Sequence, residues 1–385
     1  MSITRHFVLA AGGTGGHMMP AHALAQELIA RGHRVALITD ERGAKIPDLF
    51  DGVQTHVMPA GRITKNPLSW PRGAFAILRG RSMALELYKS FRPSVVVGFG
   101  GYPAFPAILA ASGAKIPTVV HEQNAVLGRV NRLVATRVNA IATAYPDVQR
   151  IADKNKRKVH LVGNPVRSEI LDLRDQPFPP IDGEGVFRVL VTGGSQGASI
   201  LSRVVPDGLA MLPLALRRRL QITQQCRAED IDGVRAQYAG QGIPADLATY
   251  IADMPEKLAW AHLVIGRAGA STIAELTAAG RPAIFIPLPS ATDDHQSFNV
   301  KEMVAAGGAR SIAQDNFTAV ELAKQMQKLG LEPKGLANAA GAARDCGRPH
   351  ATRDLANLVE ALGRPPVVDG IKSDAWPQGA VGAGA

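Results

Sequence analysis

The sequence contains little cysteine. Its 385 residues include two cysteines, Cys226 and Cys346. Two thiols give no disulfide framework, which fits a reducing compartment. Neither cysteine belongs to a Cys-x-x-Cys pair or a Cys/His cluster, which excludes the usual cysteine-based zinc motifs.

Long hydrophobic runs are also absent. The longest stretch without a charged residue, Pro93 to Ala114, contains several glycines and prolines. It therefore suits a strand, a loop and a short helix better than a membrane span. The apolar run Phe7 to Ala11 is too short for the core of a signal peptide. We expect a chain with neither a membrane span nor a signal peptide.

Acidic residues are scarce in the first half of the chain. Residues 1–165 contain 21 Lys and Arg but 9 Asp and Glu, whereas the remainder contains 22 and 24. The net charge of +10 therefore arises from the first half. This excess indicates a polyanionic partner, namely nucleic acid, an anionic membrane or a phosphorylated substrate. A solvated basic surface without a partner is the alternative.

Two glycine-rich turns carry the most information. Val8–His17 reads VLAAGGTGGH, and Val189–Ala198 reads VLVTGGSQGA. Each turn follows a short apolar run and precedes a stretch rich in Ala and Leu, which predicts a strand, a turn and a helix. This geometry directs backbone N–H groups and the positive end of a helix dipole at an anion. One such unit in each half suggests two domains that face a phosphate-bearing ligand.

Short apolar runs alternate with helical patterns in both halves, as in a doubly wound parallel sheet. Strands are expected at 6–10, 34–39, 94–97 and 117–121, and again at 187–191, 221–223, 263–265 and 283–286. The predicted fold is α/β, with two Rossmann-like domains facing a cleft. We place the domains at 1–165 and 166–362, with the last helices free to pack back on the first domain. Residues 363–385 are expected to be a disordered tail.

Neither glycine turn is an intact nucleotide-binding signature. The first turn lacks the last glycine of G-x-G-x-x-G and the Lys of a P-loop. His17 lies at a helix N-terminus, where the dipole favours the neutral imidazole, so it is a general base or a helix-capping residue. The second turn matches G-x-S-x-G, which makes Ser195 a candidate nucleophile with Asp293 or Asp294 and His295. The adjacent acid and histidine are a poor triad, and this reading leaves the first turn unexplained.

Further polar segments follow predicted strands. Two of them stand where α/β sheets bind ligands, namely HEQNAVLGRVN (121–131) and DDHQSFN (293–299). The second segment lacks the spacing of a metal site. Glu275, in the first turns of a helix, is placed to accept hydrogen bonds from a ribose diol or is an ordinary helix residue. The pair Asp230 and Asp232 is interpreted as solvated surface.

The segment from Trp70 to Arg92 combines apolar residues with a basic fringe. This pattern is typical of a helix that lies on an anionic bilayer, and equally of an amphipathic core helix. The basic excess of the first half favours the bilayer.

Taken together, GGTGGH, GGYP, HEQN, GNPVR, GGSQGA, GASTIAE and DDHQSFN stand in the order and spacing of one family. Over about residues 5–360 the chain resembles the GT-B enzymes of glycosyltransferase family 28 that make lipid II for peptidoglycan. The resemblance implies inverting transfer of N-acetylglucosamine from UDP-N-acetylglucosamine (UDP-GlcNAc) to the 4-hydroxyl of lipid I, without a metal or cofactor. It implies a peripheral enzyme on the anionic cytoplasmic face of the inner membrane, no nucleic-acid partner, and room for cell-wall or cell-division proteins as partners.

The same resemblance assigns roles to residues. It makes His17 the general base, with Glu122 and Asn131 as secondary candidates. It also implies that Glu275 binds the ribose and that the backbone of Ile251 recognises the uracil. Residues matched to the donor site are Thr14, Gly15, Gly16, Asn124, Arg167, Gly194, Ser195, Gln196, Ile251, Ala270, Ser271, Thr272, Glu275 and Gln296.

Two segments depart from the family pattern. Thr223 to Arg227 reads TQQCR where many members have a His-Gln run, and His295 stands where some have Gln. The first departure leaves the function of Gln224 and Gln225 unassigned. Another GT-B enzyme that transfers a UDP-sugar to a glycolipid, and a membrane sensor that binds UDP-GlcNAc without turnover, are the alternative functions.

Overall fold

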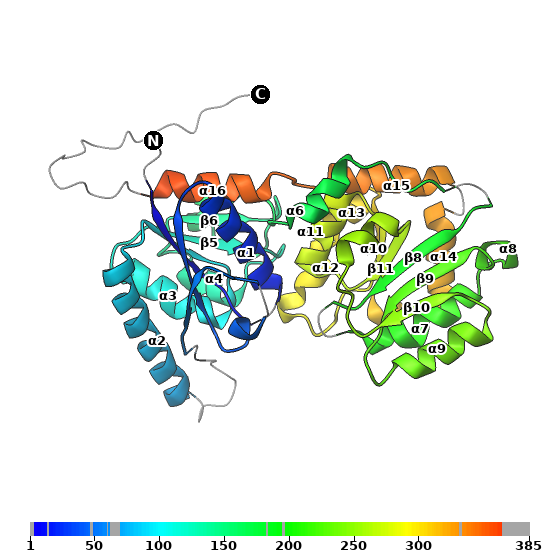
Figure 1. The fold of residues 1–385 in the computed structure, drawn as a ribbon, viewed down its shortest axis with the longest axis horizontal. Helices are drawn as coiled ribbons and strands as arrows, with labels where there is room; N and C mark the ends of the chain where they lie inside the picture. The colour runs from blue at the N-terminus through cyan, green and yellow to red at the C-terminus, as the bar shows by residue number, and fades with distance from the viewer. Residues whose placement is uncertain are drawn as a thin grey trace.

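The computed structural model describes residues 4–13, 15–46, 49–59, 61, 70–181, 184–194, 197–330 and 333–363. Figure 1 shows two lobes side by side, each with a sheet between helices. The predicted tail lies outside the described residues except for Gly363. None of the described helices combines the length and the apolar character that crossing a membrane requires.

The first lobe contains a seven-stranded sheet in the order β3-β2-β1-β4-β5-β6-β7, whose paired strands run parallel. Its strands are β1 His6–Ala10, β2 Arg34–Thr39, β3 Gln54–Val57, β4 Val95–Gly98, β5 Thr118–Glu122, β6 Ala140–Thr143 and β7 Val159–Leu161. The four predicted strands are present, the later two shifted by one residue. The other three are short and carry no long β-branched run, so sequence patterning missed them.

The second lobe repeats the arrangement with a six-stranded sheet in the order β10-β9-β8-β11-β12-β13, also parallel. Its strands are β8 Phe187–Thr192, β9 Leu220–Gln225, β10 Ala245–Ala248, β11 Leu263–Gly266, β12 Ala283–Phe285 and β13 Ala309–Ser311. The predicted α/β class with two doubly wound parallel sheets is confirmed. Sequence patterning missed β10 and β13, whose residues are largely half-buried or exposed.

Helices cover both sheets. In the first lobe and the crossover they are α1 Gly15–Ala30, α2 Trp70–Phe91, α3 Gly101–Gly113, α4 Arg129–Val134, α5 Asp153–Lys156 and α6 Ser168–Leu171. In the second they are α7 Ser199–Ala210, α8 Leu214–Arg217, α9 Ile231–Gly240, α10 Met254–Trp260, α11 Ala270–Ala279, α12 His295–Asn299, α13 Lys301–Ala305, α14 Ala319–Gly330 and α15 Pro333–Asp345. The last helix, α16, spans Ala351–Leu362.

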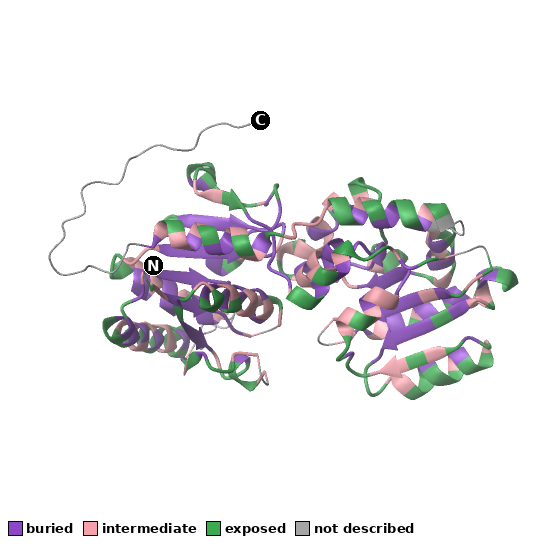
Figure 2. Cartoon of the chain, turned by 45° about the horizontal axis from the view of Figure 1, so that its top comes forward, coloured by how far each residue is buried: buried purple, intermediate pink, exposed green. Residues whose placement is uncertain are grey.

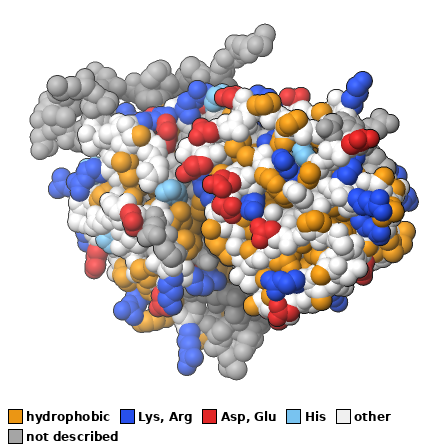
Figure 3. All heavy atoms as spheres, turned by 45° about the vertical axis from the view of Figure 1, so that its right-hand side comes forward, with side chains coloured by type: hydrophobic (Ala, Val, Ile, Leu, Met, Phe, Trp, Pro, Cys, Tyr) orange, Lys and Arg blue, Asp and Glu red, His pale blue; other side chains and the backbone are white. Residues whose placement is uncertain are grey.

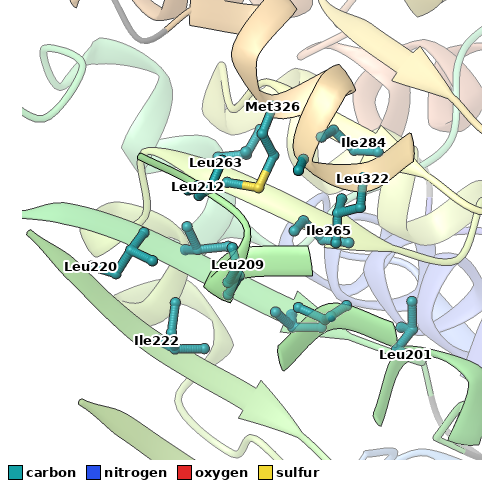
Figure 4. Packing of buried hydrophobic residues seen from close by; sticks show 14 of the residues in the cluster. Leu201, Leu209, Leu212, Leu220, Ile222, Leu263, Ile265, Ile284, Leu322 and Met326 are labelled. Atoms are coloured by element: carbon teal, nitrogen blue, oxygen red, sulfur yellow. The ribbon is translucent and has the colours of Figure 1, made fainter. Parts of the chain in front are cut away.

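Each sheet is buried on both faces. Figure 2 shows the strands in purple beneath helices whose outer sides are exposed. In the second lobe, aliphatic side chains of β8, β9 and β11, such as Ile265, pack against those of α7 and α14, such as Leu209 and Leu322 (Figure 4). Burial of apolar surface on both sides explains why the central strands read as continuous hydrophobic runs.

The chain crosses between the lobes twice. After residues 162–167 carry it into the second lobe, α16 returns to pack on the first, next to α1 (Figure 1). Leu355 and Val359 of α16 are fully buried in the core formed by β1 and α1. Arg31, the residue after α1, also pairs with Glu360 of α16 at 2.6 Å. The second lobe is therefore joined to the first by two segments of backbone.

The topology places the loops that follow the central strands together. Ala10 of β1 pairs with Gly98 of β4, and Gly98 pairs with Val120 of β5, so these strands end at the same edge. The strand order reverses between β1 and β4, and likewise between β8 and β11. Ligands of open α/β sheets bind outside the carboxyl ends at such switch points. The polar segments singled out in the sequence follow these strands.

Candidate active site

His17 lies between the first glycine turn and the turn after β4. Gly100 and Gly101 adopt positive φ angles of 86° and 72°, and a Cβ on either would lie 3.4 Å from the His17 ring. Glycine is therefore required here both for the backbone conformation and for the approach of the ring. Burial lowers the pKa of His17, although the nearby Glu122 carboxylate opposes the shift. The imidazole is neutral at neutral pH, as a proton acceptor must be.

Glu122 organises the loop that follows β5. Its buried carboxylate accepts hydrogen bonds from the backbone N–H groups of Asn124 and Gly128 at 3.1 and 2.7 Å. The side-chain amides of Asn124 and Asn131 donate to it at 3.3 and 2.9 Å. These donors compensate the buried charge and fix residues 122–131. With both oxygens already engaged, the carboxylate is suited to holding the loop.

A pocket of about 290 Å³ opens beside these groups. It is lined from the first lobe by His17, Glu122, Asn124 and Asn131, and from the second by Asp293 and His295, among others. The structure thus brings together three segments that are more than 90 residues apart in sequence. Within the described part of the chain, the Asn131 Oδ1 atom is buried and has no hydrogen-bond partner.

A buried asparagine connects the two lobes behind Asn124, one of the residues that line this pocket. Asn299, at the end of α12, accepts a hydrogen bond from Ala125 N–H at 2.8 Å and donates to Asn124 Oδ1 at 3.1 Å. The same amide donates to the Ala268 carbonyl at 3.2 Å. Gln296 of α12 accepts from the N–H groups of Ala268 and Leu288, so α12 ties the loop after β11 to the first lobe.

Ion pairs reinforce the same junction. The Asp293 carboxylate lies 2.7 Å from Arg132 and 2.7 Å from Arg150, both of the first lobe, and 3.9 Å from Arg129. Asp293 and Asp294 both have φ near 57°, a left-handed conformation that aspartate tolerates better than most residues. The arginines, together with hydrogen bonds, hold the pKa of Asp293 below its usual value despite some burial.

The second glycine turn is held by a glutamine of β9. Gln225 accepts hydrogen bonds from the Thr192 hydroxyl and the Gly193 N–H at 3.1 and 3.2 Å. Its amide nitrogen donates to the Thr249 carbonyl at 3.3 Å, next to the segment that contains Ile251. The TQQCR departure therefore places a structural glutamine behind the turn. Gly194 has a φ of 75°, whereas Thr14, Ser195 and Gln196 lie outside the described residues.

Glu275 of α11 and Arg167, the residue before α6, form a half-buried pair. Arg167 Nη2 lies 3.2 Å from Glu275 Oε1, and burial raises the pKa of Glu275 while Arg167 opposes the shift. Glu275 follows Ala270, Ser271 and Thr272, the first residues of α11, whose N–H groups begin the helix. The Ser271 Oγ atom is buried without a hydrogen-bond partner among the described residues. This edge is suited to an anion and a hydroxyl-rich group.

The remaining predicted residues are more dispersed. Gly15 and Gly16 open α1 beside His17, and Ile251 is buried under α10 and α11. Asp293, Asp294 and His295 do not pair with one another, because they contact Arg132, Ser297 and the Thr292 carbonyl. Across the described ranges, no group of three or more His, Cys, Asp and Glu side chains is placed to hold a metal ion.

Asn299 and the arginines that face Asp293 have functions in the structure that the sequence did not predict. Asn299 is the last residue of the DDHQSFN segment, so the motif marked the position but not its function. Arg132 and Arg150 lie in segments of ordinary helical or loop composition. Their convergence on Asp293, more than 140 residues away, depends on how the lobes pack and leaves no local signal.

Comparison with known proteins agrees with this geometry. Residues 7–143 match the glycosyltransferase family 28 N-terminal domain, and residues 188–358 match the family 28 C-terminal domain. The chain belongs to glycosyltransferase family 28. In this family 28 chain, the first match contains β2 to β6 and all of β1 except His6. The second contains β9 to β13 and all of β8 except Phe187.

Relatives of this family 28 chain are similar over nearly their whole length. It is 65% identical to an Erythrobacter litoralis protein over 96% of this chain and 92% of that one, and 64% identical to a Novosphingobium aromaticivorans protein over 99% and 98%. Both are named "UDP-N-acetylglucosamine--N-acetylmuramyl-(pentapeptide) pyrophosphoryl-undecaprenol N-acetylglucosamine transferase". Acinetobacter baumannii MurG superimposes with a TM-score of 0.75 at 30% identity, covering 93% of this chain and 99% of that chain.

The ion pairs of Asp293 make a quantitative prediction. In double-mutant cycles with Asp293→Asn, we expect Arg132→Leu to show a coupling energy of about 1 kcal/mol or more, and Arg150→Leu about 0.5 kcal/mol or less. The reason is solvent screening, since the Arg132 side chain is 27% exposed and that of Arg150 50%. Urea unfolding measures both couplings. The exposed pair Arg235 and Asp232 is the control, with a coupling near zero; equal couplings for both arginines of the first lobe would contradict the prediction.

Proposed function

We propose that this chain transfers N-acetylglucosamine from UDP-GlcNAc to the 4-hydroxyl of the N-acetylmuramoyl sugar of lipid I, giving lipid II and UDP in peptidoglycan synthesis. The observation that carries this function is identity of 64–65% to transferases named for it, across nearly the whole chain. The pocket between the lobes supports this proposal, because its lining combines His17, next to the first glycine turn, with polar groups of the segment 122–131.

His17 is the general base in this proposal. As the acceptor hydroxyl attacks the anomeric carbon, its proton passes to the imidazole, the new glycosidic bond forms, and the bond to UDP breaks with inversion. Three features support this role: the neutral state that burial imposes, the position in the pocket, and the glycine turns that hold the ring. Glu122 fixes the loop that bears Asn131, which contributes a free amide oxygen.

The departing diphosphate requires positive potential. Arg167 and the N–H groups at the start of α11 supply it, together with the glycine turn at 193–194. Ser195 and Gln196, which lie outside the described residues, are assigned to the same group of donors. Thr14, which also lies outside them, is assigned with Gly15 and Gly16 to the donor's sugar and the acceptor's diphosphate. On this account, donor binding redirects Arg167 from Glu275 towards phosphate oxygens.

The nucleoside lies along the edge of the second sheet. Glu275 accepts hydrogen bonds from the ribose diol, and the backbone of Ile251 recognises the uracil. Gln296 and Asn124 bind the sugar hydroxyls. Gln296 also accepts hydrogen bonds from Ala268 and Leu288 of its own lobe, whereas Asn124 accepts one from Asn299 across the junction. Since these two side chains come from different lobes, sugar binding and lobe packing depend on one another.

The acceptor brings a polyprenyl chain, so the first lobe must meet a membrane. The first half of α2 presents Phe75 and Leu78, which are 68% and 63% exposed, while its second half packs on the core. Arg72 and Arg79 flank these apolar residues. An apolar and basic helix of this kind suits an anionic bilayer, which favours peripheral binding on the cytoplasmic face of the inner membrane. The second lobe, turned forward in Figure 3, shows basic and acidic side chains intermixed.

The proposal predicts transfer of labelled N-acetylglucosamine from UDP-GlcNAc to a short-chain lipid I analogue in the presence of EDTA. We expect His17→Ala to retain UDP-GlcNAc binding by calorimetry and to lose at least about a hundredfold in kcat, because a general base typically contributes this much. In the wild type, kcat/KM falls as the pH drops through the pKa of His17, which lies below the usual value of about 6.5.

Two results would count against this assignment. Wild-type protein that binds UDP-GlcNAc but forms no disaccharide would indicate another acceptor or a sensor. Near-normal turnover by His17→Ala would exclude His17 as the base.

Replacement of the ribose ligand is expected to weaken donor binding. Glu275→Gln removes the charge from two hydrogen bonds, so we expect the Kd for UDP-GlcNAc to rise about tenfold or more. Calorimetry measures the change, with Glu256→Gln on the exposed side of α10 as the control. An unchanged Kd would eliminate the ribose assignment.

Membrane binding is expected to depend on α2. The double substitution Phe75→Ser and Leu78→Ser removes two apolar side chains that would each contribute about 1.5–3 kcal/mol on burial. We expect at least about a tenfold loss of binding to phosphatidylglycerol vesicles in sedimentation. Val320→Ser, at an exposed position of the second lobe, is the matched control. Equal binding by both variants would refute a role for α2.

A further inference from the structure

Gln123 lies buried between two histidines. Its side-chain oxygen is 3.3 Å from His17 Nδ1, and its side-chain nitrogen is 3.0 Å from His121 Nδ1. The residue is 2% exposed, and none of the roles assigned above involves it. A buried amide with both ends against imidazoles determines which ring nitrogens carry protons.

The orientation of this amide follows from its other contacts. The nitrogen also lies 3.0 Å from the Phe99 carbonyl oxygen and 3.3 Å from the His121 carbonyl oxygen. Carbonyl oxygens only accept hydrogen bonds, so the NH₂ group must be on this side. The amide oxygen therefore faces His17, and since it can only accept, His17 Nδ1 must donate.

The hydrogen bonds of His121 determine its tautomer in the same way. His121 Nε2 lies 2.9 Å from the Gly163 carbonyl oxygen, which obliges Nε2 to donate. Burial lowers the pKa of His121 to about 4, so the ring is neutral and its Nδ1 accepts from Gln123. A directed chain of hydrogen bonds thus runs from His17 through Gln123 and His121 to the backbone of the first crossover.

We propose that Gln123 is a positioning residue that holds His17 in the tautomer protonated at Nδ1, which leaves Nε2 as the atom that accepts the proton of the acceptor hydroxyl. The proposal rests on the proposed function for the identity of the base. The tautomer itself is a property of the free protein and is independent of the substrate.

This arrangement also serves the reaction step. When Nε2 takes the proton, the ring becomes an imidazolium and its Nδ1–H bond to the Gln123 oxygen becomes charge-assisted, hence stronger. The titratable groups that face the ring are Glu122 of β5, which favours the cation, and His295 of α12, which disfavours it. The amide oxygen thus binds the imidazolium more strongly than the neutral ring. Unlike a carboxylate, it carries no charge in the resting state.

The anchor of the chain is at a rigid part of the crossover. Gly163 has a φ of 92°, and a Cβ there would lie 2.7 Å from Arg348 Cβ and 2.9 Å from Ala351 Cβ. The two segments that join the lobes are therefore in contact at the residue whose carbonyl holds His121. The fixed Gly163 carbonyl restrains the rotation of His121 and, through it, of Gln123. The orientation of the Gln123 amide in turn determines the tautomer of His17.

The test is ¹⁵N NMR of histidine-labelled protein without substrate, with the His17 signals assigned by loss in His17→Gln. We expect a protonated Nδ1 and an unprotonated Nε2 in the wild type at neutral pH. Gln123→Met, similar in length but unable to bind either ring, should give a mixture of the two tautomers. In the transfer assay it should lower kcat about 10- to 100-fold with little change in KM for either substrate.

Two further variants complete the experiment. Gln123→Glu keeps an acceptor towards His17, so it should retain the Nδ1-protonated tautomer and shift the acid limb of the pH profile upward. Gln149→Met, in an exposed hydrogen bond to Asp147, should change neither tautomer nor kcat. A wild-type His17 protonated at Nε2, or an unchanged tautomer in Gln123→Met, would overturn the proposal. Correct tautomers in a protein that forms no disaccharide would refute the proposed function and leave this inference standing.

Discussion

The burial of the Glu122 carboxylate is the constraint on which the site depends. A charge taken out of water must be compensated by hydrogen bonds, and the donors available here are the loop residues 124–131. Satisfying the carboxylate fixes Asn124, which then binds Asn299 of the second lobe. The electrostatic requirement of one side chain thereby determines the shape of the loop and the contact between the lobes.

The two parallel sheets determine where the loops of the site lie. Because all central strands of a sheet end at one edge, each glycine turn lies at a switch point beside polar residues from neighbouring strands. The two edges meet across a junction whose contacts include buried amides and ion pairs as well as Phe298 of α12, which packs on the first lobe. Junctions of this partly polar kind are more easily separated than a continuous hydrophobic core.

Histidine chemistry in this site follows from burial combined with directional hydrogen bonds. Burial favours the neutral rings of His17 and His121, and the carbonyls of Phe99 and Gly163 set the direction of the bonds between them. The basic excess of the first half has two uses in the structure. Part of it pairs with Asp293 at the junction, and part lies exposed on α2, at the end remote from the core contacts.

The sequence by itself determined the α/β class, the two doubly wound sheets and most central strands, because parallel strands are continuous apolar runs and glycine turns have strong local signatures. It also predicted which segments follow those strands. The tertiary structure alone decided that Asn299 joins the lobes, that Arg132 and Arg150 meet Asp293, and that Gln123 stands between His17 and His121. These contacts depend on the packing of distant segments, and nothing in the composition of a short segment encodes its partner.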